Sequence, residues 1–331
     1  MILIDNENQN NPQINLALEE YIVRNFDADE DYLLFYVNQP SIIIGKHQNT
    51  IEEINAQYVQ ENNVTVVRRI SGGGAVYHDF GNLNFSFLTK YDSKKVNNFI
   101  QFVQPIVDTL KAMGVPAEMT GRNDILAEGR KISGNAQFST TKKMFSHGTL
   151  LFDANIESVV NALNVSGDKI TSKGIQSVRS RVANILDFLP NKITLQQFKD
   201  LLLKGIFKDN AINTYTLSAS EWEKVNELSV QKYQTWDWNY GRSPEYNIQR
   251  KNRFAFGQVD ARLEVAQGCL VGVKFFGDFL AHGEVAHLEA KLIGVRYTQQ
   301  SIAFVLDMID LTHYFGEIST EDFAKFMCDL V

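Results

Sequence analysis

Apolar residues recur at helical spacing in some stretches of this chain, and in others they run together or alternate. The stretch "NPQINLALEEYIVRNF" carries apolar side chains three and four residues apart behind Asn11-Pro12, which predicts a helix. "YLLFYV" and "SIIIG" are short apolar runs that predict buried strands, and "IEEINAQYVQENN" predicts one short helix. "VNNFIQFVQPIVDTLKAMG" predicts a long amphipathic helix that ends at Gly114.

Several stretches with the pattern of β-strands follow one another in the middle of the sequence, and stretches with the pattern of helices come after them. The strands are expected at "VTVV", "NLNFSF", "DILAEG", "RKISGNAQF" and "MFSHGTLLF", and the helices at "ITLQQFKDLLLKGIF" and "SASEWEKVNELSVQKY". Clustered strands with helices, rather than a regular strand–helix alternation, favour the α+β class. We therefore expect a mixed β-sheet flanked by helices.

A second, smaller domain is predicted after the turn-rich stretch "WDWNYGRSPEYN", Trp236 to Asn247. Beyond it, "RFAFGQVDARLEVAQGCLVGVKFFGDF" alternates like antiparallel strands around a Gln267-Gly268 turn. "QSIAFVLDMIDLTHYF" and "TEDFAKFMCDL" predict helices, which makes this piece a small α+β domain. The expected boundaries are 1–246 for the main domain and 247–331 for the accessory domain.

Composition narrows the class of protein. The chain has 331 residues and a net charge of −7, and no apolar run approaches the ~18 residues that span a membrane. The acidic balance argues against a nucleic-acid partner. Only Cys269 and Cys328 are present, and the N-terminal stretch lacks a basic segment before its apolar patch, so a cytoplasmic protein without a secretory signal is expected.

The charge is unevenly distributed along the chain. Between Arg68 and Arg181 there are 15 basic and 9 acidic residues, which leaves this segment cationic inside an acidic protein. Such a segment suits a local anion site, although scattered surface lysines would give the same count.

The stretch "RRISGGGAVYHDFGNLNFSF", Arg68 to Phe87, places two arginines and a serine before three successive glycines. Glycine loses more backbone freedom on folding than any other residue, so such a tract indicates close approach of the backbone to something, or a positive φ. With strands predicted on both sides, the glycines form either an anion-binding loop or a structural turn.

A second stretch, "GRNDILAEGRKISGNAQ", contains Lys131 within a strand pattern. Alternation places Lys131 opposite to Arg130 and Ile132, where the lysine is either solvated or directed at a ligand. A third stretch, "SKGIQSVRSRVANI", adds the cations Lys173, Arg179 and Arg181 and is a candidate surface for an acidic partner. The spacing in "HGEVAH", His282 to His287, does not suit a zinc helix, and surface histidines are expected there.

Together these stretches resemble the lipoate–protein ligase family. The resemblance rests on "NLALEEY", "IIIGKHQN", "RRISGGGAVYHDFGNLNFSF", "GRNDILAEGRKISGNAQ", "HGTLLF", "SKGIQSVRSRVANI" and "WDWNYGRSPEYN", in this order from about Asn15 to Asn247. It implies a fold shared with biotin protein ligases, in which a mixed sheet flanked by helices holds an acyl-adenylate. The C-terminal piece is similar to the accessory domain of the longer ligases.

The resemblance also implies a reaction: ATP activates lipoate, and also octanoate, as an acyl-AMP, and the acyl group then passes to a lysine of a carrier domain. Lys131 is implied as the catalytic residue, in contact with the lipoate carboxyl and the phosphate, and Arg69 with it binds lipoate and nucleotide. Asp124 is implied to hold Mg²⁺ or a nucleotide group, and no other metal site is expected. The residues implied to bind ATP and lipoyl-AMP are Arg69, Ser71, Gly72, Gly73, Gly74, Ala75, Val76, Tyr77, Asp124 and Lys131.

The expected partners are lipoyl carrier domains of 2-oxoacid dehydrogenase E2 subunits, the glycine-cleavage carrier protein, or both, and the expected oligomeric state is a monomer. Ile42 to Ile44 either line a slot for the acyl chain or belong to the core. Three alternatives stand beside the ligase: a thioester-forming transferase, a biotin ligase, and a carrier-binding regulator without chemistry. The first requires a nucleophilic cysteine, and residues 1 to 267 contain none.

Overall fold

The computed structural model describes residues 1–120, 123–163, 181–208, 210–240 and 248–328. Within these residues the chain divides into two compact units, and each is described by itself. The first comprises Met1–Ile44, Ile51–Arg69 and Ala75–Asn239, and the second comprises Gly45–Thr50, Ile70–Gly74 and Tyr240–Val331. Two short segments from early in the sequence therefore belong to the unit that holds the C-terminal part of the chain.

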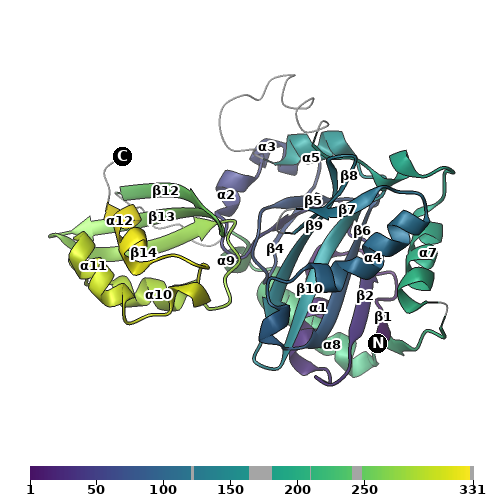
Figure 1. Ribbon diagram of the computed structural model, residues 1–331, viewed down its shortest axis with the longest axis horizontal. Helices are drawn as coiled ribbons and strands as arrows, with labels where there is room; N and C mark the ends of the chain where they lie inside the picture. The colour runs from purple at the N-terminus through teal and green to yellow at the C-terminus, as the bar shows by residue number, and fades with distance from the viewer. Residues whose placement is uncertain (121–122, 164–180, 209, 241–247, 329–331) are drawn as a thin grey trace. The chain divides into compact units, whose positions relative to one another are not determined.

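An eight-stranded sheet forms the centre of the first unit (Figure 1). Its strand order is β11-β1-β2-β6-β10-β9-β8-β7. β1 pairs in parallel with β2 and with β11, whereas the other neighbours are antiparallel, so the sheet is mixed. The strands are β1 (Ile2–Asp5), β2 (Tyr32–Tyr36), β6 (Asn82–Lys90), β7 (Ala117–Thr120), β8 (Asp124–Ala127), β9 (Arg130–Ser139), β10 (Lys143–Leu151) and β11 (Thr214–Thr216).

A second, three-stranded sheet in the same unit has the order β4-β3-β5. β3 (Ser41–Ile44) is its central strand, and it pairs in parallel with β4 (Thr65–Arg68) and antiparallel with β5 (Val76–His78). The chain between β4 and β5 contains the three glycines. The glycine tract therefore joins two strands that are both paired with β3 and not with each other.

Helices cover the large sheet. α4 (Ile100–Ala112) and α7 (Leu195–Phe207) pack on each other and on the sheet, and side chains from both helices share one core with β2 and β6. α1 (Pro12–Asn25) contacts β4 and β10, and it also packs against α8 (Ala219–Leu228). The other α-helices among the described residues of this unit are short: α3 (Ala56–Glu61), α5 (Ile156–Ala162) and α9 (Trp236–Asn239). α2 (Thr50–Glu53) also belongs to this unit apart from its first residue, Thr50.

The second unit contains a three-stranded antiparallel sheet, β12-β13-β14. Its strands are β12 (Ile248–Phe254), β13 (Gly257–Ala266) and β14 (Cys269–Gly277), and its helices are α10 (Val285–Leu292), α11 (Gln299–Leu306) and α12 (Thr320–Cys328) (Figure 1). The sheet and these helices share one apolar core. Gln267 and Gly268, both with positive φ, form the β13–β14 turn that the sequence predicts.

The predicted class, α+β with a mixed sheet flanked by helices, is confirmed. The first predicted helix is α1, where the Asn11 side chain accepts hydrogen bonds from two backbone N–H groups and Pro12 follows it. "IEEINAQYVQENN" forms two short helices instead of one, because Asn55 caps a new helix start by accepting from the N–H of Tyr58. The sequence stretches did not predict β1, β5, β7, β11, α5, α9 or α10, nor most of β12.

Candidate functional site

Lys131 lies at an irregular position near the start of β9. Between β8 and β9 the register shifts, so that Leu126 faces Lys131 and Ile125 faces Ser133, which leaves Ile132 as an extra residue. Bulges of this kind redirect side chains and are common beside functional sites. The backbone of Lys131 pairs with β8 on one side, and on the other its N–H donates to the carbonyl of Arg181 at 2.7 Å. The position of Lys131 is therefore well defined.

The side chain of Lys131 meets that of Asp124. Lys131 Nζ lies 2.8 Å from Asp124 Oδ1, and the two side chains are 35% and 36% exposed. A Cβ at Gly134 would lie 2.8 Å from Lys131 Nζ, so the absence of a side chain there leaves room for the ammonium group. The structure thus brings together two residues of the predicted site, at a place that solvent and ligands can reach.

Arg69 differs from a surface arginine because it is only 6% exposed. One guanidinium nitrogen donates to the carbonyl of Ile43 at 3.0 Å. Burial lowers the pKa of Arg69 to about 10, against the opposing influence of Tyr36 and Glu19. The guanidinium is still charged at neutral pH, so the first unit holds a sheltered cation at the end of β4.

Arg68 has a different environment, although it is also buried and its pKa is also lowered to about 10 by burial. Its backbone N–H donates to Asn239 Oδ1 at 2.9 Å, and its carbonyl accepts from Trp238 Nε1 at 2.8 Å. Its Nε donates to the carbonyl of Trp238 at 2.9 Å. β4 is an edge strand, so α9 occupies the place of a neighbouring strand and satisfies the polar groups of that edge. The predicted boundary stretch "WDWNYGRSPEYN" thus begins as a cap on β4; its part from 241 to 247 lies outside the described residues.

The glycine tract belongs to the second unit, together with Ser71. A Cβ at Gly72 would lie 2.5 Å from the carbonyl oxygen of Phe279, and Gly73 has φ +91°. Close packing therefore explains why residue 72 is glycine, and the positive φ explains why residue 73 is glycine. A Cβ at Gly74 would meet nothing within 4 Å. The structure therefore requires glycine at 72 and 73, whereas neither packing nor φ accounts for Gly74.

Ala75, Val76 and Tyr77 return the chain to the first unit, where the latter two lie on β5. Val76 pairs with Ile43, and Tyr77 pairs with Ile42. Tyr77 is half-buried, which raises the pKa of its hydroxyl. Ile42, Ile43 and Ile44 are at most 2% exposed in the central strand of the small sheet, which supports their interpretation as core.

A buried polar cluster in the first unit was not assigned from the sequence. His147 Nδ1 lies 2.9 Å from both carboxylate oxygens of Glu19, and both residues are buried. Asn38 Nδ2 lies 3.0 Å from Nδ1 of buried His78. Burial, together with the nearby Arg69 and His147, lowers the pKa of His78 to about 3, so His78 is neutral at physiological pH. The clue in the sequence is a glutamate inside the apolar pattern of α1.

β6, which pairs with the strand that carries His147, has further polar side chains at alternate positions. Ser86 of β6 is directly opposite His147 of β10, and Asn82 and Asn84 follow the same alternation. All three β6 side chains are buried, and Ser86 Oγ and Asn82 Oδ1 have no hydrogen-bond partner among the described residues. Buried polar atoms of this kind normally face ordered water or a ligand. This strip, Asn82, Asn84, Ser86 and His147, is therefore a candidate ligand-facing surface.

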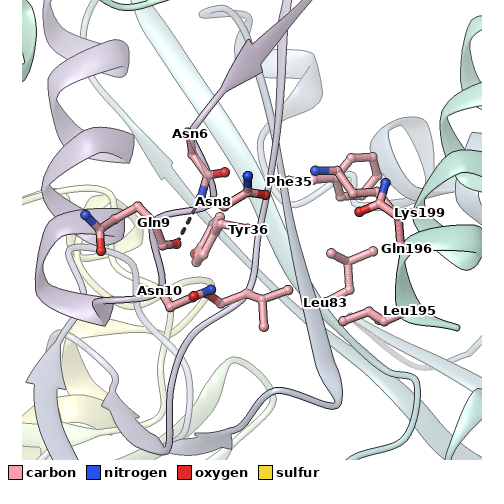
Figure 2. A pocket seen from close by; sticks show the side chains of 11 residues that line it. Asn6, Asn8, Gln9, Asn10, Phe35, Tyr36, Leu83, Leu195, Gln196 and Lys199 are labelled. Carbon is pink, nitrogen blue, oxygen red and sulfur yellow. Dashed lines mark hydrogen bonds between the residues drawn. The ribbon is translucent and has the colours of Figure 1, made fainter.

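A separate small pocket, of about 80 Å³, lies beside the turn that follows β1. Figure 2 shows its amide side chains together with Phe35, Leu83 and Lys199, and Asn6 Nδ2 donates to the Gln9 carbonyl at 3.1 Å. Tyr36, which lines this pocket, also raises the pKa of Arg69 through its charge. None of the predicted site residues lines it, so we assign it no part in the chemistry.

Some of the remaining predicted features lie within the described residues and others lie outside them. Lys173 and Arg179 lie outside them, whereas Arg181 contributes the carbonyl that fixes Lys131. His282 and His287 are exposed, as expected. The described part of the chain holds no group of three or more potential metal ligands. No helix among the described residues is long and apolar enough to cross a membrane.

Two family models match the chain. The model of the lipoyl protein ligase A/B catalytic domain matches residues 11–207, and that of the bacterial lipoate protein ligase C-terminus matches residues 243–327. The chain is 55% identical to lipoate-protein ligase LplJ of Bacillus subtilis over 326 residues, which covers 98% of each chain. It is 49% identical to lipoate–protein ligase 1 of Staphylococcus aureus over 327 residues, or 99% of this chain and 100% of the relative.

Solved structures agree with these relatives. LipL1 of P. falciparum, solved in complex with lipoate, superposes with a TM-score of 0.79 at 27% identity and covers 94% of both chains. A bi-partite lipoate protein ligase from Thermoplasma acidophilum, studied with its E2 lipoyl domain, gives a TM-score of 0.66 at 29% identity and covers 75% of this chain and 98% of its own. Lipoate-protein ligase A bound with ATP gives 0.60 at 29% identity and covers 73% of this chain and 97% of its own. The chain is therefore an enzyme of the lipoate–protein ligase family.

Proposed function

We propose that this enzyme uses ATP to convert lipoate, and also octanoate, into an acyl-adenylate and then transfers the acyl group to a lysine of a carrier domain. In the first step a carboxylate oxygen attacks the α-phosphorus and pyrophosphate leaves. In the second step the carrier amine attacks the acyl carbon and AMP leaves. The observation that carries the proposal is the partly exposed Lys131–Asp124 pair at the β9 bulge in a chain of this family.

The first step brings two anions together, so it needs cations and N–H donors that offset their charge. We propose that Lys131 contacts the lipoate carboxyl and the α-phosphate, as a point charge suited to oxygen atoms. The buried guanidinium of Arg69 supplies a second, fixed cation. We propose that the stretch from Ser71 to Tyr77 approaches the adenylate through its backbone, as the family resemblance implies.

Mg²⁺ fits this site only as a companion of ATP. Asp124 is a single carboxylate already paired with Lys131, and the described residues hold no cluster of three potential ligands around it. Mg²⁺ in nucleotide sites commonly takes one or two protein carboxylates together with phosphate oxygens and water. We propose that Asp124 supplies at most one such ligand, while the metal's charge neutralises the phosphates.

The proposed acyl acceptors are lipoyl domains of E2 subunits, the glycine-cleavage carrier protein, or both. The support is that the similar ligase of Thermoplasma acidophilum was studied with an E2 lipoyl domain. We propose that the enzyme acts as a monomer.

The direct test combines the protein with Mg-ATP, lipoate and a lipoyl domain. We expect pyrophosphate release, together with a mass increase of the lipoyl domain by one lipoyl group. A lipoyl domain whose target lysine is replaced by arginine should gain no mass but should leave the first pyrophosphate release intact. Acyl transfer in the absence of ATP would contradict the proposal.

The cysteines provide a test against the thioester alternative. Cys269 and Cys328 are partly buried and lie on β14 and α12 of the second unit. The double variant Cys269→Ser, Cys328→Ser should retain ligation within about twofold, because changes outside a functional site rarely cost more than ~0.5 kcal/mol. A folded double variant without activity would favour a thioester intermediate.

Gly74 offers a test of the loop that separates packing from ligand binding. Gly74→Val adds a side chain where a Cβ meets nothing within 4 Å, so the melting temperature should stay close to that of the wild type. If the loop backbone approaches the nucleotide, the added side chain should weaken adenylate binding at least tenfold, or about 1.4 kcal/mol. Calorimetry with a non-hydrolysable acyl-adenylate analogue measures this, and unchanged affinity would remove Gly74 from the site. Gly72→Val is the contrasting variant, because it clashes with the Phe279 carbonyl and should destabilise the loop itself.

We also propose a division of labour, with residues 1–246 carrying adenylate binding and transfer and residues 247–331 acting as an accessory domain. The two separate family matches, and the coverage of only 75% of this chain by a bi-partite ligase, support this proposal.

A further inference from the structure

The segment Gly45–Thr50 belongs to the second unit, as the glycine tract does. The N–H of Lys46 donates to the carbonyl of Ser71 at 2.9 Å. A Cβ at Gly45 would lie 1.8 Å from the carbonyl oxygen of Gly73, so the two backbones are in close contact. Lys46 is therefore fixed beside the loop that we propose approaches the nucleotide.

The C-terminal part of the same unit holds this segment in place. The His47 ring stacks on Phe279 with 4.8 Å between centroids and 15° between planes. The carbonyl of His47 accepts from the N–H of Gly277 at 2.8 Å. Because Gly72 also lies against the carbonyl of Phe279, one residue supports both segments. The backbone around Lys46 is thus fixed on two sides.

The ammonium group of Lys46 forms an ion pair with an acidic residue of the same unit. Lys46 Nζ is 2.8 Å from Glu284 Oε1, and the lysine side chain is 17% exposed whereas that of Glu284 is 60% exposed. Glu284 precedes α10, and its side chain makes no capping hydrogen bond. A sheltered cation thus faces an exposed carboxylate, and an ion pair with an exposed partner contributes little to stability.

The leaving pyrophosphate carries negative charge, as the reacting carboxylate and the α-phosphate do. Arg69 and Lys131 are assigned to the carboxylate and the α-phosphate, and neither is reserved for the leaving group. When the carboxylate oxygen bonds to the α-phosphorus, the bond to the bridging oxygen breaks, and pyrophosphate leaves with that electron pair. Lysine is a common ligand of such phosphates because it is a compact point charge.

We propose that Lys46 binds the β- and γ-phosphates of the nucleotide, which leave as pyrophosphate, and that Glu284 is the counter-ion that they displace. This proposal rests on the proposed ATP-dependent function. Lys46 therefore serves acyl-adenylate formation and has no part in acyl transfer, since lipoyl-AMP carries no pyrophosphate. Glu284 competes with the nucleotide for the same ammonium group.

Steady-state pyrophosphate release at varied ATP measures the first step, and transfer from pre-formed lipoyl-AMP to a lipoyl domain measures the second. Lys46→Gln should raise KM for ATP about 10–100-fold, the value of a charge-assisted hydrogen bond, and leave transfer within about twofold. Lys46→Arg keeps the charge and should recover most of the loss. Unchanged KM for ATP in Lys46→Gln, or an equal loss in both steps, would overturn the proposal.

Glu284→Gln should have the opposite effect and lower KM for ATP about 2–5-fold, the range for an exposed ion pair. The decisive comparison is the double variant, because Glu284→Gln should change nothing when Lys46 is already glutamine. An equal effect of Glu284→Gln in both backgrounds would show that it does not act through Lys46. Asp29→Asn is the matched control, since it removes the carboxylate of another exposed pair, Asp29–Lys90, and should leave both steps unchanged.

The two levels of the proposal can fail separately. A wild-type protein that releases no pyrophosphate with lipoate and ATP would contradict the proposed function. A wild-type protein that is active, with variants that do not differ from it, would contradict only the assignment of Lys46 and Glu284.

Discussion

Lys131→Ala is expected to reduce formation of the acyl-adenylate about 10²–10³-fold, the usual loss when one charged or hydrogen-bonding group is removed from a polar transition state. The fold should survive, because the Lys131 side chain is 35% exposed and its ion pair with Asp124 is accessible to solvent. Such pairs contribute about 1 kcal/mol or less to stability. Pyrophosphate release measures the loss, and thermal unfolding measures the stability.

Two control variants distinguish a role in catalysis from a role in structure. Lys131→Arg keeps the charge, but a planar guanidinium presents its donors differently from a point-charge ammonium, so partial activity is expected. Asp124→Asn breaks the ion pair without removing Lys131. If Asp124 were only the partner of Lys131, activity would change less than tenfold, or about 1.4 kcal/mol. A near wild-type rate for Lys131→Ala would show that the assignment is wrong.

The sequence predicted the long elements well, because their apolar periodicity is local. α1, α4, α7, β13 and β14 stand where the pattern placed them, whereas most of β12 lies before the stretch in which strands were predicted. β5 and β11 have only three residues each, and a pattern of that length has no period to detect. Such strands form because distant partners pair with them, as β3 does with β5.

The glycine tract shows what a local pattern leaves out. The three residues look equivalent in sequence, yet Gly72 is required by Phe279 and Gly73 by its own φ. The reason for Gly72 lies about 200 residues away along the chain, in the second unit, so no local rule could supply it. The two neighbouring arginines likewise differ only through their contacts. Arg68 donates to the carbonyl of Trp238 in α9, whereas Arg69 donates to the carbonyl of Ile43 in the small sheet.

The bulge at Ile132 and the Glu19–His147 pair depend on tertiary contacts in the same way. Strict alternation described Lys131 as opposite to Ile132, which agrees with the complete burial of Ile132, but it did not predict the extra residue. A glutamate within a helix pattern is normally solvated. Glu19 is buried because a histidine from β10 lies within hydrogen-bond distance of it.

Removal of the C-terminal part is the second change with a large expected effect. A chain that ends at Tyr240 keeps the core of the first unit, which draws all its residues from that unit. It also keeps Trp238 and Asn239, so the edge of β4 stays satisfied. The position of the cut matters: a chain ending at Gln234 would lose the hydrogen bonds between Arg68 and α9, at about 0.5–1.5 kcal/mol for each. We expect the longer fragment to unfold cooperatively and the shorter one to be clearly less stable.

The fragment that ends at Tyr240 should fail mainly in the first step of the reaction. It lacks Phe279 and Glu284, so the glycine tract and Lys46 lose the contacts that fix them in the second unit. A disordered loop must be ordered again before it can bind ATP, at about 1–2 kcal/mol for each backbone residue fixed. Over the loop this corresponds to a decrease in acyl-adenylate formation of at least about 100-fold.

Transfer from pre-formed lipoyl-AMP should decrease less, because Lys131 and Arg69 remain in the folded unit. Pyrophosphate release and carrier lipoylation, measured on the same preparation, separate the two steps. If the folded fragment formed the adenylate at the wild-type rate, the loop would need no support from the C-terminal part.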